Sequence, residues 1–301
     1  MVKTLWLGTW RLGGEGFGPS NLKESIESIE YAYELGIRHF DTANFYAHGK
    51  SNAILSKLTK KYRSSLIVSS KGGLVWETPN LVKHDASKEA LTQDLHETLK
   101  RLGTDYLDYY LLHWPDPTIS LERSLEVLLA FQREGLIKKW GVCNLSIKML
   151  NSFESFIRPL NENGILHQVH HNILHQQNEI LQIGANLKLR NIIYSPFEQG
   201  LLANPISRYQ NNPIGYIRKK NSYFSNSKIH QKLHFLEKKL KESGIEKKEY
   251  TLYWLLKDFR CADIILGSHS IEQLNGIFTA IASIQKQKDL YRNLEKELIF
   301  E

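Results

Sequence analysis

The stretch GIRHFDTANFY, residues 36–46, carries the pattern on which the prediction of the fold rests. A short run containing His39 and Phe40 ends on a carboxylate, Asp41, and the loop that leaves it carries Tyr46. Short runs of this kind are typical of buried parallel strands, because other elements cover both faces of such a sheet. The stretch therefore indicates a strand of a parallel sheet with polar side chains at its end.

Similar short runs recur along the chain. They predict strands over Leu5–Gly8, His39–Asp41, Leu66–Ser70, Leu107–His113, Trp140–Cys143, Leu166–His170, Ile192–Ser195 and Ile264–Gly267. Apolar residues at helical spacing predict helices over Ser25–Leu35, Ala90–Leu102, Leu121–Phe131, Ile147–Ile157, Glu249–Asp258 and Ile271–Ile284. Strands that alternate with helices predict an α/β fold, and a closed (β/α)₈ TIM barrel is its simplest form here.

The rival architecture is an open doubly wound sheet, which binds a dinucleotide at a Gly-rich turn after its first strand. The candidate turn is GGEGFG, residues 13–18, but Pro19 stands where the last glycine of that motif belongs. No long helix begins there either, so a plain loop is the favoured interpretation. Three loops are expected to set specificity: Gly13–Asn21, Trp76–Ala86 and the long irregular stretch Gln199–Ile229.

Length and composition narrow the class of protein. The 301 residues are predicted to form one barrel domain over 1–301, since no Pro/Gly/Ser-rich linker interrupts them. The formal charge of +7 comes from scattered basic pairs with acidic neighbours, which favours solvated helix faces over nucleic-acid binding. Two cysteines exclude a disulfide scaffold. Without a signal peptide or an apolar run of membrane length, a cytoplasmic location is expected.

Three polar residues stand where predicted strands end: Asp41, Lys71 and His113. A fourth, Tyr46, lies in the loop that follows Asp41. In a parallel barrel the carboxyl ends of all strands face the same mouth, so these side chains are expected to converge. The Lys71 ammonium is expected to lower the pKa of the Tyr46 phenol, which normally ionises near ~10. Asp41 would hold Lys71 charged, and His113 would polarise a carbonyl oxygen.

Such a site suits hydride delivery to a carbonyl carbon with a proton supplied to its oxygen. The hydride has to come from a cofactor, because no side chain provides one.

The sequence resembles the aldo-keto reductase family over nearly the whole chain, and six blocks carry the resemblance. They are LGTW at 7–10, GIRHFDTANFY at 36–46, Ser70-Lys71, LGTDYLDYYLLHWPDP at 102–117, GVCNLS at 141–146 and YSPFEQGLL at 194–202. The resemblance implies a (β/α)₈ barrel that binds NADP(H) without a Rossmann domain and reduces an aldehyde or ketone to the alcohol. It implies Asp41, Tyr46, Lys71 and His113 as the catalytic residues, with Tyr46 as the proton donor.

The same resemblance implies a set of cofactor contacts. Asn144 and Gln168 would bind the nicotinamide carboxamide, Tyr194 would stack on its ring, Ser195, Gly200 and Leu201 would line the pyrophosphate path, and Gly267, Ser268, His269 and Gln273 would surround the adenosine 2′-phosphate. NADPH is expected, with NADH possible, because Gly276 and Ile277 depart from the family pattern around adenine and the last phosphate segment has Ser268 and His269 in place of a Lys or an Arg.

Four aromatic residues, Trp10, Phe45, Trp76 and Trp114, are expected to line the mouth for a small carbonyl substrate with an apolar or stackable face, sugars included. A metal is not expected at the histidine group 167–175. On a strand His167 and His171 share one face and His170 the other, and no cysteine or carboxylate of the sequence around them completes a tetrahedral set.

Two other functions stay open. In the same barrel Lys71 would be the nucleophile of a Schiff-base lyase, although its pairing with Asp41 argues against this. The chain would otherwise be a nicotinamide-binding regulatory subunit with slow or no turnover. The sequence decides neither the oligomeric state nor the physiological direction of the reaction.

Overall fold

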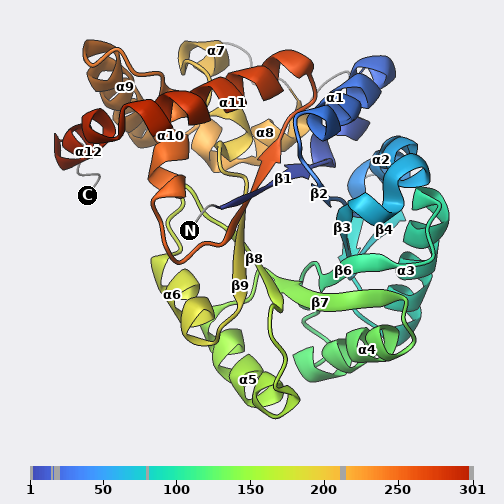
Figure 1. The fold of residues 1–301 in the computed structure, drawn as a ribbon. Coiled ribbons are helices and arrows are strands. Elements are labelled where there is room, and N and C mark those ends of the chain that lie inside the picture. Colours follow the sequence, from blue (N-terminus) through green and yellow to red (C-terminus); the bar gives the residue numbers. More distant parts are fainter. Residues whose placement is uncertain (1–2, 15, 17–20, 79–80, 211–214, 298–301) are drawn as a thin grey trace.

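The computed structural model describes residues 3–14, 16, 21–78, 81–210 and 215–297. Eight parallel strands close into a barrel in the order β1-β2-β3-β6-β7-β8-β9-β10 (Figure 1). They are β1 Thr4–Gly8, β2 His39–Asp41, β3 Ile67–Gly72, β6 Leu107–Leu112, β7 Ile137–Cys143, β8 Leu166–His170, β9 Arg190–Tyr194 and β10 Asp263–Gly267. The predicted TIM barrel and its eight strands are confirmed, and the open-sheet alternative is wrong.

The predicted ends of some strands were wrong by one to three residues, most at β7, which begins at Ile137 instead of Trp140. β3 extends to Gly72, so that Lys71 lies inside the strand instead of following it. β9 begins at Arg190 and ends at Tyr194, which leaves Ser195 outside. His113 is the first residue after β6. The ends move because ladder pairing to neighbouring strands, which the local sequence does not encode, decides where a strand stops.

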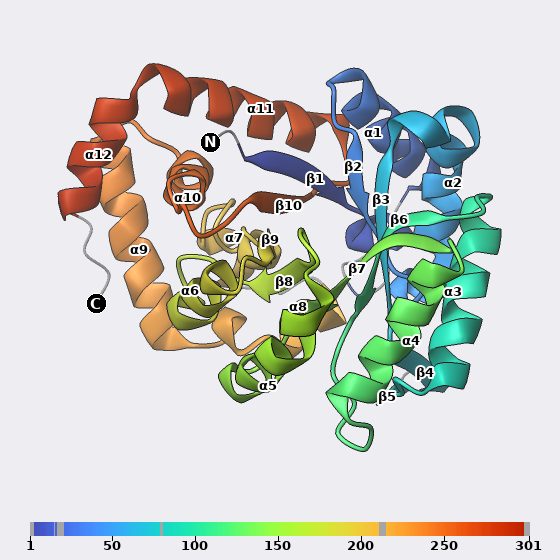
Figure 2. The ribbon, with the colours of Figure 1, turned by 60° about the horizontal axis from the view of Figure 1, so that its bottom comes forward.

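Helices surround the barrel, as the two views in Figures 1 and 2 show. They are α1 Leu22–Glu34, α2 Lys50–Tyr62, α3 Lys88–Leu102, α4 Leu121–Arg133, α5 Ile147–Ile157, α6 Asn178–Asn186, α7 Ser207–Gln210, α8 Tyr216–Lys220, α9 Ser227–Glu242, α10 Lys247–Leu256, α11 Ile271–Lys286 and α12 Lys288–Glu297. Among the described residues, no helix is long and apolar enough to cross a membrane.

All six predicted helices are present, with ends shifted by up to three residues, but α2, α6, α7, α8, α9 and α12 were not predicted. α2 starts after Gly49, which has a left-handed backbone and offers no side-chain cap. α9 begins within the stretch predicted as irregular, and its cap was visible: the Asn226 side chain accepts hydrogen bonds from the backbone N–H of Lys228 and Ile229.

A hairpin, β4 Leu74–Thr78 with β5 Leu81–His84, follows β3 directly and was also not predicted. Its strand β4 carries Trp76, whose Nε1 donates a hydrogen bond to the Phe45 carbonyl at 3.1 Å. The hairpin thereby contacts the loop that carries Tyr46. This part of the predicted specificity loop 76–86 is therefore ordered as strands.

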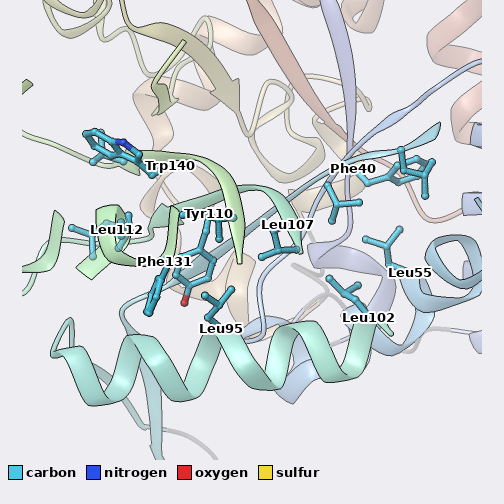
Figure 3. Packing of buried hydrophobic residues seen from close by; sticks show 14 of the residues in the cluster. Phe40, Leu55, Leu95, Leu102, Leu107, Tyr110, Leu112, Phe131 and Trp140 are labelled. Carbon is cyan, nitrogen blue, oxygen red and sulfur yellow. The ribbon is translucent and has the colours of Figure 1, made fainter. Parts of the chain in front are cut away.

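The strands bury both faces, as expected of a parallel barrel. Along β6, Tyr110 and Leu112 pack outward with residues of α3 and α4 such as Leu95 and Phe131 (Figure 3). Tyr109 and Leu111 belong instead to the cluster that fills the barrel interior, whose other members are Trp6, Cys143, Leu166, Ile192 and Ile265. This alternation leaves the carboxyl ends of the strands as the place where polar side chains gather.

One buried polar contact in this outer layer makes stability depend on pH. Asp94 on α3 accepts a hydrogen bond from the Tyr110 hydroxyl at 2.8 Å. Burial raises the pKa of Asp94 to about 7, and hydrogen bonds from Tyr110 and Asn44 offset only part of this rise. The folded state therefore holds a proton that the unfolded chain, with a pKa of about 3.9, has already lost at pH 5.

We expect this group to lower the free energy of unfolding as pH rises from about 4 to 7, and to have no further effect above that. The variant Asp94→Asn keeps an acceptor for Tyr110 and removes the titration. Urea unfolding at pH 5 and pH 8 should show the wild type losing stability relative to Asp94→Asn at the higher pH. A difference between the two proteins that stays constant across this range would contradict the assignment.

Candidate active site

A cavity of about 1080 Å³ opens at the carboxyl ends of the barrel strands. Strand-end residues in its wall include Gly8 of β1, Asp41 of β2, Tyr194 of β9 and Gly267 of β10. Tyr46 and His113 also line it, from loops that leave β2 and β6. The predicted convergence at one mouth is therefore present in the structure.

Lys71 lies at the base of this site with only 1% of its surface exposed. Its Nζ lies 2.6 Å from Asp41 Oδ1, 2.9 Å from the Thr42 carbonyl and 3.0 Å from the Tyr46 hydroxyl. An ammonium has three N–H donors, and these contacts use all of them. Lys71 does not line the cavity itself but acts on it through the Tyr46 oxygen.

The second oxygen of Asp41 is also satisfied. Asp41 Oδ2 accepts hydrogen bonds from Ser69 Oγ and Gln168 Nε2, both at 2.8 Å. The neighbours come from β3 and β8, so the carboxylate links three strands of the barrel interior. A buried ion pair is tolerated when its remaining polar atoms are hydrogen-bonded in this way.

We expected Lys71 to lower the pKa of Tyr46 below its ordinary value. The sum of all effects on this pKa is instead a rise, so that expectation was wrong. Burial raises the pKa of Tyr46 to about 12, and the nearby Asp41 carboxylate adds to the rise. Lys71 does lower this pKa, as expected, but by less than the other two raise it. Around neutral pH the phenol is therefore fully protonated and its hydroxyl is a hydrogen-bond donor.

His113 is neutral for a related reason. Burial, with smaller effects of Lys71 and His84, holds its pKa well below the ordinary value. Its ring meets the Tyr46 ring edge-on, with 5.8 Å between centroids. Its Nδ1 has no hydrogen-bond partner among the described residues. The arrangement thus offers two neutral groups, a phenol and an imidazole, to one reacting oxygen.

Two amide side chains predicted to hold a carboxamide lie beside these groups. Asn144 donates from Nδ2 to the His113 carbonyl at 2.9 Å, and its Oδ1 accepts from the Tyr194 hydroxyl at 2.6 Å. Gln168 donates to Asp41, as described above. Each amide has two donors and two acceptor positions, so both retain capacity for a ligand.

Most of the other predicted contacts line the same cavity: Tyr194, Ser195, Gly200, Gly267, His269 and Gln273, and of the aromatic residues Trp10, Phe45 and Trp114. Leu201 and Ser268 do not line it, since both are 0% exposed, and Ser268 Oγ donates to the Ser270 carbonyl. Trp76 does not line it either. The hairpin stacks its ring on Phe45 at 4.4 Å, so that Trp76 supports the wall instead of forming it.

The cavity also holds cationic residues that were not predicted to line it, namely Arg11, Arg208, Arg218, Lys220 and Lys248. Burial and the neighbouring Arg218 and Arg208 guanidinium groups lower the pKa of Arg11 to about 10. Arg11 directly follows Trp10 at the exit of β1, which is a signal that the strand-exit argument could have used. The other four come from α7, α8 and α10, whose positions at the cavity depend on the tertiary fold.

The backbone is strained around the site. Among the described residues, eight that are not glycine have a positive φ angle. Four of them, Asn144, Ser195, Glu198 and Gln199, line the cavity, and Ala47 and His48 directly follow Tyr46. Such conformations cost about 1–3 kcal/mol each and cluster where function requires a defined geometry.

The histidines of β8 and its exit loop point to different neighbours, as the alternation of a strand predicts. His167 Nδ1 contacts Asn191, and His170 lines the cavity beside Glu198. His171 lies 3.7 Å from Asp258. Carboxylates thus lie beside two of these histidines, but the described part of the chain holds no group of three or more metal-ligating side chains.

Comparison with known proteins places this geometry in context. Residues 4–298 match the model of the aldo/keto reductase family. The chain is 34% identical over 205 residues to the aldo-keto reductase YhdN of Bacillus subtilis, a match that covers 67% of this chain and 60% of that protein. It is 30% identical over 224 residues to the NADH-specific methylglyoxal reductase of Escherichia coli, with 69% and 67% covered.

The chain therefore matches less than two thirds of the length of the Bacillus subtilis relative. Among solved structures, the glycerol dehydrogenase of Gluconobacter oxydans superimposes with a TM-score of 0.76 and 19% identity, and the match covers 99% of this chain and 93% of that one. At that identity the likeness shows the fold alone.

The Asp41–Lys71 pair makes a testable contribution to stability. In the variant Asp41→Asn the buried ammonium loses its counter-charge, and we expect the free energy of unfolding at pH 7 to fall by about 3–5 kcal/mol. The double variant Asp41→Asn/Lys71→Met removes both charges and should recover part of that loss. Urea unfolding measures both, and equal losses in the single and double variants would show that the charge pair does not matter.

Proposed function

The chain belongs to the aldo/keto reductase family, and from that premise we propose that it reduces an aldehyde or a ketone to the alcohol with a nicotinamide cofactor. One observation carries the proposal: the Lys71 ammonium joins the Asp41 carboxylate to the Tyr46 hydroxyl at the cavity wall, with neutral His113 beside it. This set gives a carbonyl oxygen a proton donor and a second hydrogen-bond donor at the same point.

The cofactor, when bound, supplies the hydride for the carbonyl carbon. The residues of the chain manage the oxygen. Tyr46 and His113 donate hydrogen bonds to it, and these strengthen as negative charge develops there. The Tyr46 proton then moves to the oxygen, and Lys71 stabilises the phenolate that remains until solvent returns the proton.

The raised pKa of Tyr46 suits this direction of reaction. An alkoxide is about as basic as hydroxide, and is therefore a far stronger base than a phenolate. A phenol with a pKa of about 12 is still acidic enough to protonate it. At the same time the phenol keeps its proton throughout the neutral range, so that the donor is always loaded.

The residues of the cavity fit a nicotinamide dinucleotide. Arg11, Arg208 and Arg218 bring guanidinium groups to one cavity, and guanidinium is the group best suited to bind phosphates through paired hydrogen bonds. Tyr194 offers a ring, and Asn144 offers amide donors and acceptors for a carboxamide. We assign the phosphates to the arginines and the nicotinamide to the tyrosine.

NADPH is the favoured cofactor because of Lys248. This lysine lines the cavity together with Gln273 and Gly276. A Cβ atom placed on Gly276 would lie only 2.9 Å from Lys248 Nζ, so the glycine leaves the room that the lysine occupies. We assign Lys248 to the 2′-phosphate that distinguishes NADPH from NADH, replacing the basic residue that the segment 267–270 lacks.

For the substrate, we propose a small carbonyl compound. Trp10, Phe45 and Trp114 line the cavity beside Tyr46, and such a wall favours a compact ligand with an apolar or flat face. The name of the Escherichia coli relative gives methylglyoxal as the first compound to try.

The Schiff-base alternative loses support. A lysine nucleophile needs an unprotonated amine. Although burial alone would lower the pKa of Lys71, Asp41 and Tyr46 raise it above the ordinary value, and all three N–H groups are engaged. The lysine is thus held as an ammonium.

Replacing the proton donor tests the function. We expect Tyr46→Phe to lower kcat for carbonyl reduction by about 100-fold or more, because it removes the general acid. The affinity for NADPH, measured by fluorescence titration, should stay the same. Tyr62→Phe, which removes an exposed phenol on α2 far from the cavity, is the matched control and should keep full activity.

Unchanged turnover in Tyr46→Phe would refute the assignment of Tyr46. A wild-type protein that binds the cofactor but reduces none of a panel of small aldehydes and ketones would favour the regulatory-subunit function instead.

The cofactor preference has its own test. We expect Lys248→Met to raise the Kd for NADPH about 10- to 100-fold and to leave the Kd for NADH unchanged, since a charged hydrogen bond to the 2′-phosphate contributes about 1.5–3 kcal/mol. Lys241→Met, on α9 outside the cavity, makes the same change of net charge and should alter neither value. Equal changes for NADPH and NADH would remove Lys248 from the 2′-phosphate.

A further inference from the structure

The rings of His175, His170 and Tyr194 form a stack at the end of β8, and the proposed reaction assigns no role to the two histidines. The His170 imidazole lies between two rings in the wall of the cavity. Its centroid is 5.2 Å from that of Tyr194, with 22° between the planes, and 4.2 Å from that of His175, with 16° between the planes. His170 therefore covers one face of the tyrosine that is assigned to the nicotinamide.

A buried carboxylate fixes this imidazole. Glu198 is 1% exposed, and its Oε2 accepts hydrogen bonds from His170 Nε2 and Asn172 Nδ2, both at 2.8 Å. Its Oε1 accepts from Asn221 Nδ2 at 2.7 Å. Burial alone would raise the pKa of Glu198, but these hydrogen bonds lower it, so the group stays ionised. An ionised acceptor at Nε2 sets both the tautomer and the plane of the ring.

Glu198 reaches this place at a conformational cost. Its φ angle is 44°, a left-handed value that a residue with a side chain rarely adopts, and the next residue, Gln199, has a φ of 54°. A strained position that persists because it places one side chain is a sign of function. Here the side chain placed is the carboxylate that holds His170.

The far end of Tyr194 is fixed as well. Its hydroxyl donates to Asn144 Oδ1 at 2.6 Å, and Asn144 in turn donates to the His113 carbonyl at 2.9 Å. With its hydroxyl tied to Asn144 and one face covered by His170, the Tyr194 ring is oriented at both ends. A planar ligand group can stack only on its other face.

We propose that His170 is a positioning residue: Glu198 fixes its imidazole, the imidazole fixes the plane of Tyr194, and that plane sets where the nicotinamide ring stacks. The inference rests on the proposed function, since it concerns the same cofactor. It adds two residues, from β8 and from the loop after β9, that act on the nicotinamide half of the cofactor without belonging to the four catalytic residues.

Two ligands that differ only in the nicotinamide ring test this inference. They are NADPH and 2′-phospho-ADP-ribose, whose Kd values are measured by calorimetry on the full chain. We expect His170→Ala to weaken NADPH about three- to tenfold, the range for one aromatic pair, and to leave 2′-phospho-ADP-ribose unchanged. His170→Phe keeps an aromatic face against Tyr194 and should restore most of the NADPH affinity.

A double-mutant cycle tests the part assigned to Glu198. Glu198→Gln should weaken NADPH when residue 170 is the native histidine and have no further effect in the background of His170→Phe, because phenylalanine has no hydrogen bond to lose. If His170→Ala does not fold, His170→Leu replaces it, since leucine fills similar space without an aromatic face.

Weakening of both ligands to the same degree would show a merely structural role and overturn the inference, as would an unchanged Kd for NADPH in His170→Ala. A wild-type protein that binds neither NADPH nor NADH refutes the proposed function itself, so the two failures are told apart by the wild-type titration.

Discussion

The site depends on one buried charge, the ammonium of Lys71. A lysine with 1% of its surface exposed remains charged only if its three protons and its charge are matched, and Asp41, Thr42 and Tyr46 do this together. Parallel pairing places Asp41 of β2 opposite Ser69 of β3, two residues before Lys71. The register of two neighbouring strands thus sets the distance between the charges, and the loop after β2 has to return so that Tyr46 meets the ammonium.

The same burial that makes the ion pair necessary also decides the acid–base character of the site. The dry surroundings raise the pKa of Tyr46 and lower that of His113, so both groups are held in their neutral, proton-bearing forms. A site with these two groups is a poor base at neutral pH and a good hydrogen-bond donor. Reduction of a carbonyl uses these groups in the forms they already hold, whereas oxidation of an alcohol would need the Tyr46 phenolate.

The parts of the molecule that the sequence predicts are those with local patterns. Eight strands and the residues at their exits follow from short apolar runs that end on polar side chains, and Asp41, Tyr46 and His113 converge as the barrel requires. The net pKa of Tyr46 was not predictable, because burial is a property of the whole fold. For the same reason the sequence did not predict that Arg208, Arg218 and Lys248 line the cavity. The helices that carry them, α7, α8 and α10, approach it only through tertiary packing. Trp76 was misplaced because its hairpin has no signal beyond two exposed, partly apolar strands.

The proposed cofactor has to be bound by its phosphates and also positioned at its nicotinamide ring. The His170–Glu198 pair lies beside Tyr194, the residue assigned to that ring. The arginines that we assign to the cofactor phosphates would supply binding energy that is the same for the ground state and the transition state. Such energy speeds a reaction only when it positions the reacting group. The Tyr194 ring is held by Asn144 at its hydroxyl and by His170 on one face. A ring fixed in this way would let the cofactor's binding energy serve to position the nicotinamide. Because Asn144 also donates a hydrogen bond to the His113 carbonyl, it connects Tyr194, which we assign to the nicotinamide, to His113, which we assign to the carbonyl oxygen. In the proposed arrangement a change at Glu198, which contacts His170 but neither Tyr194 nor His113, would alter the distance between the nicotinamide ring and the carbonyl carbon.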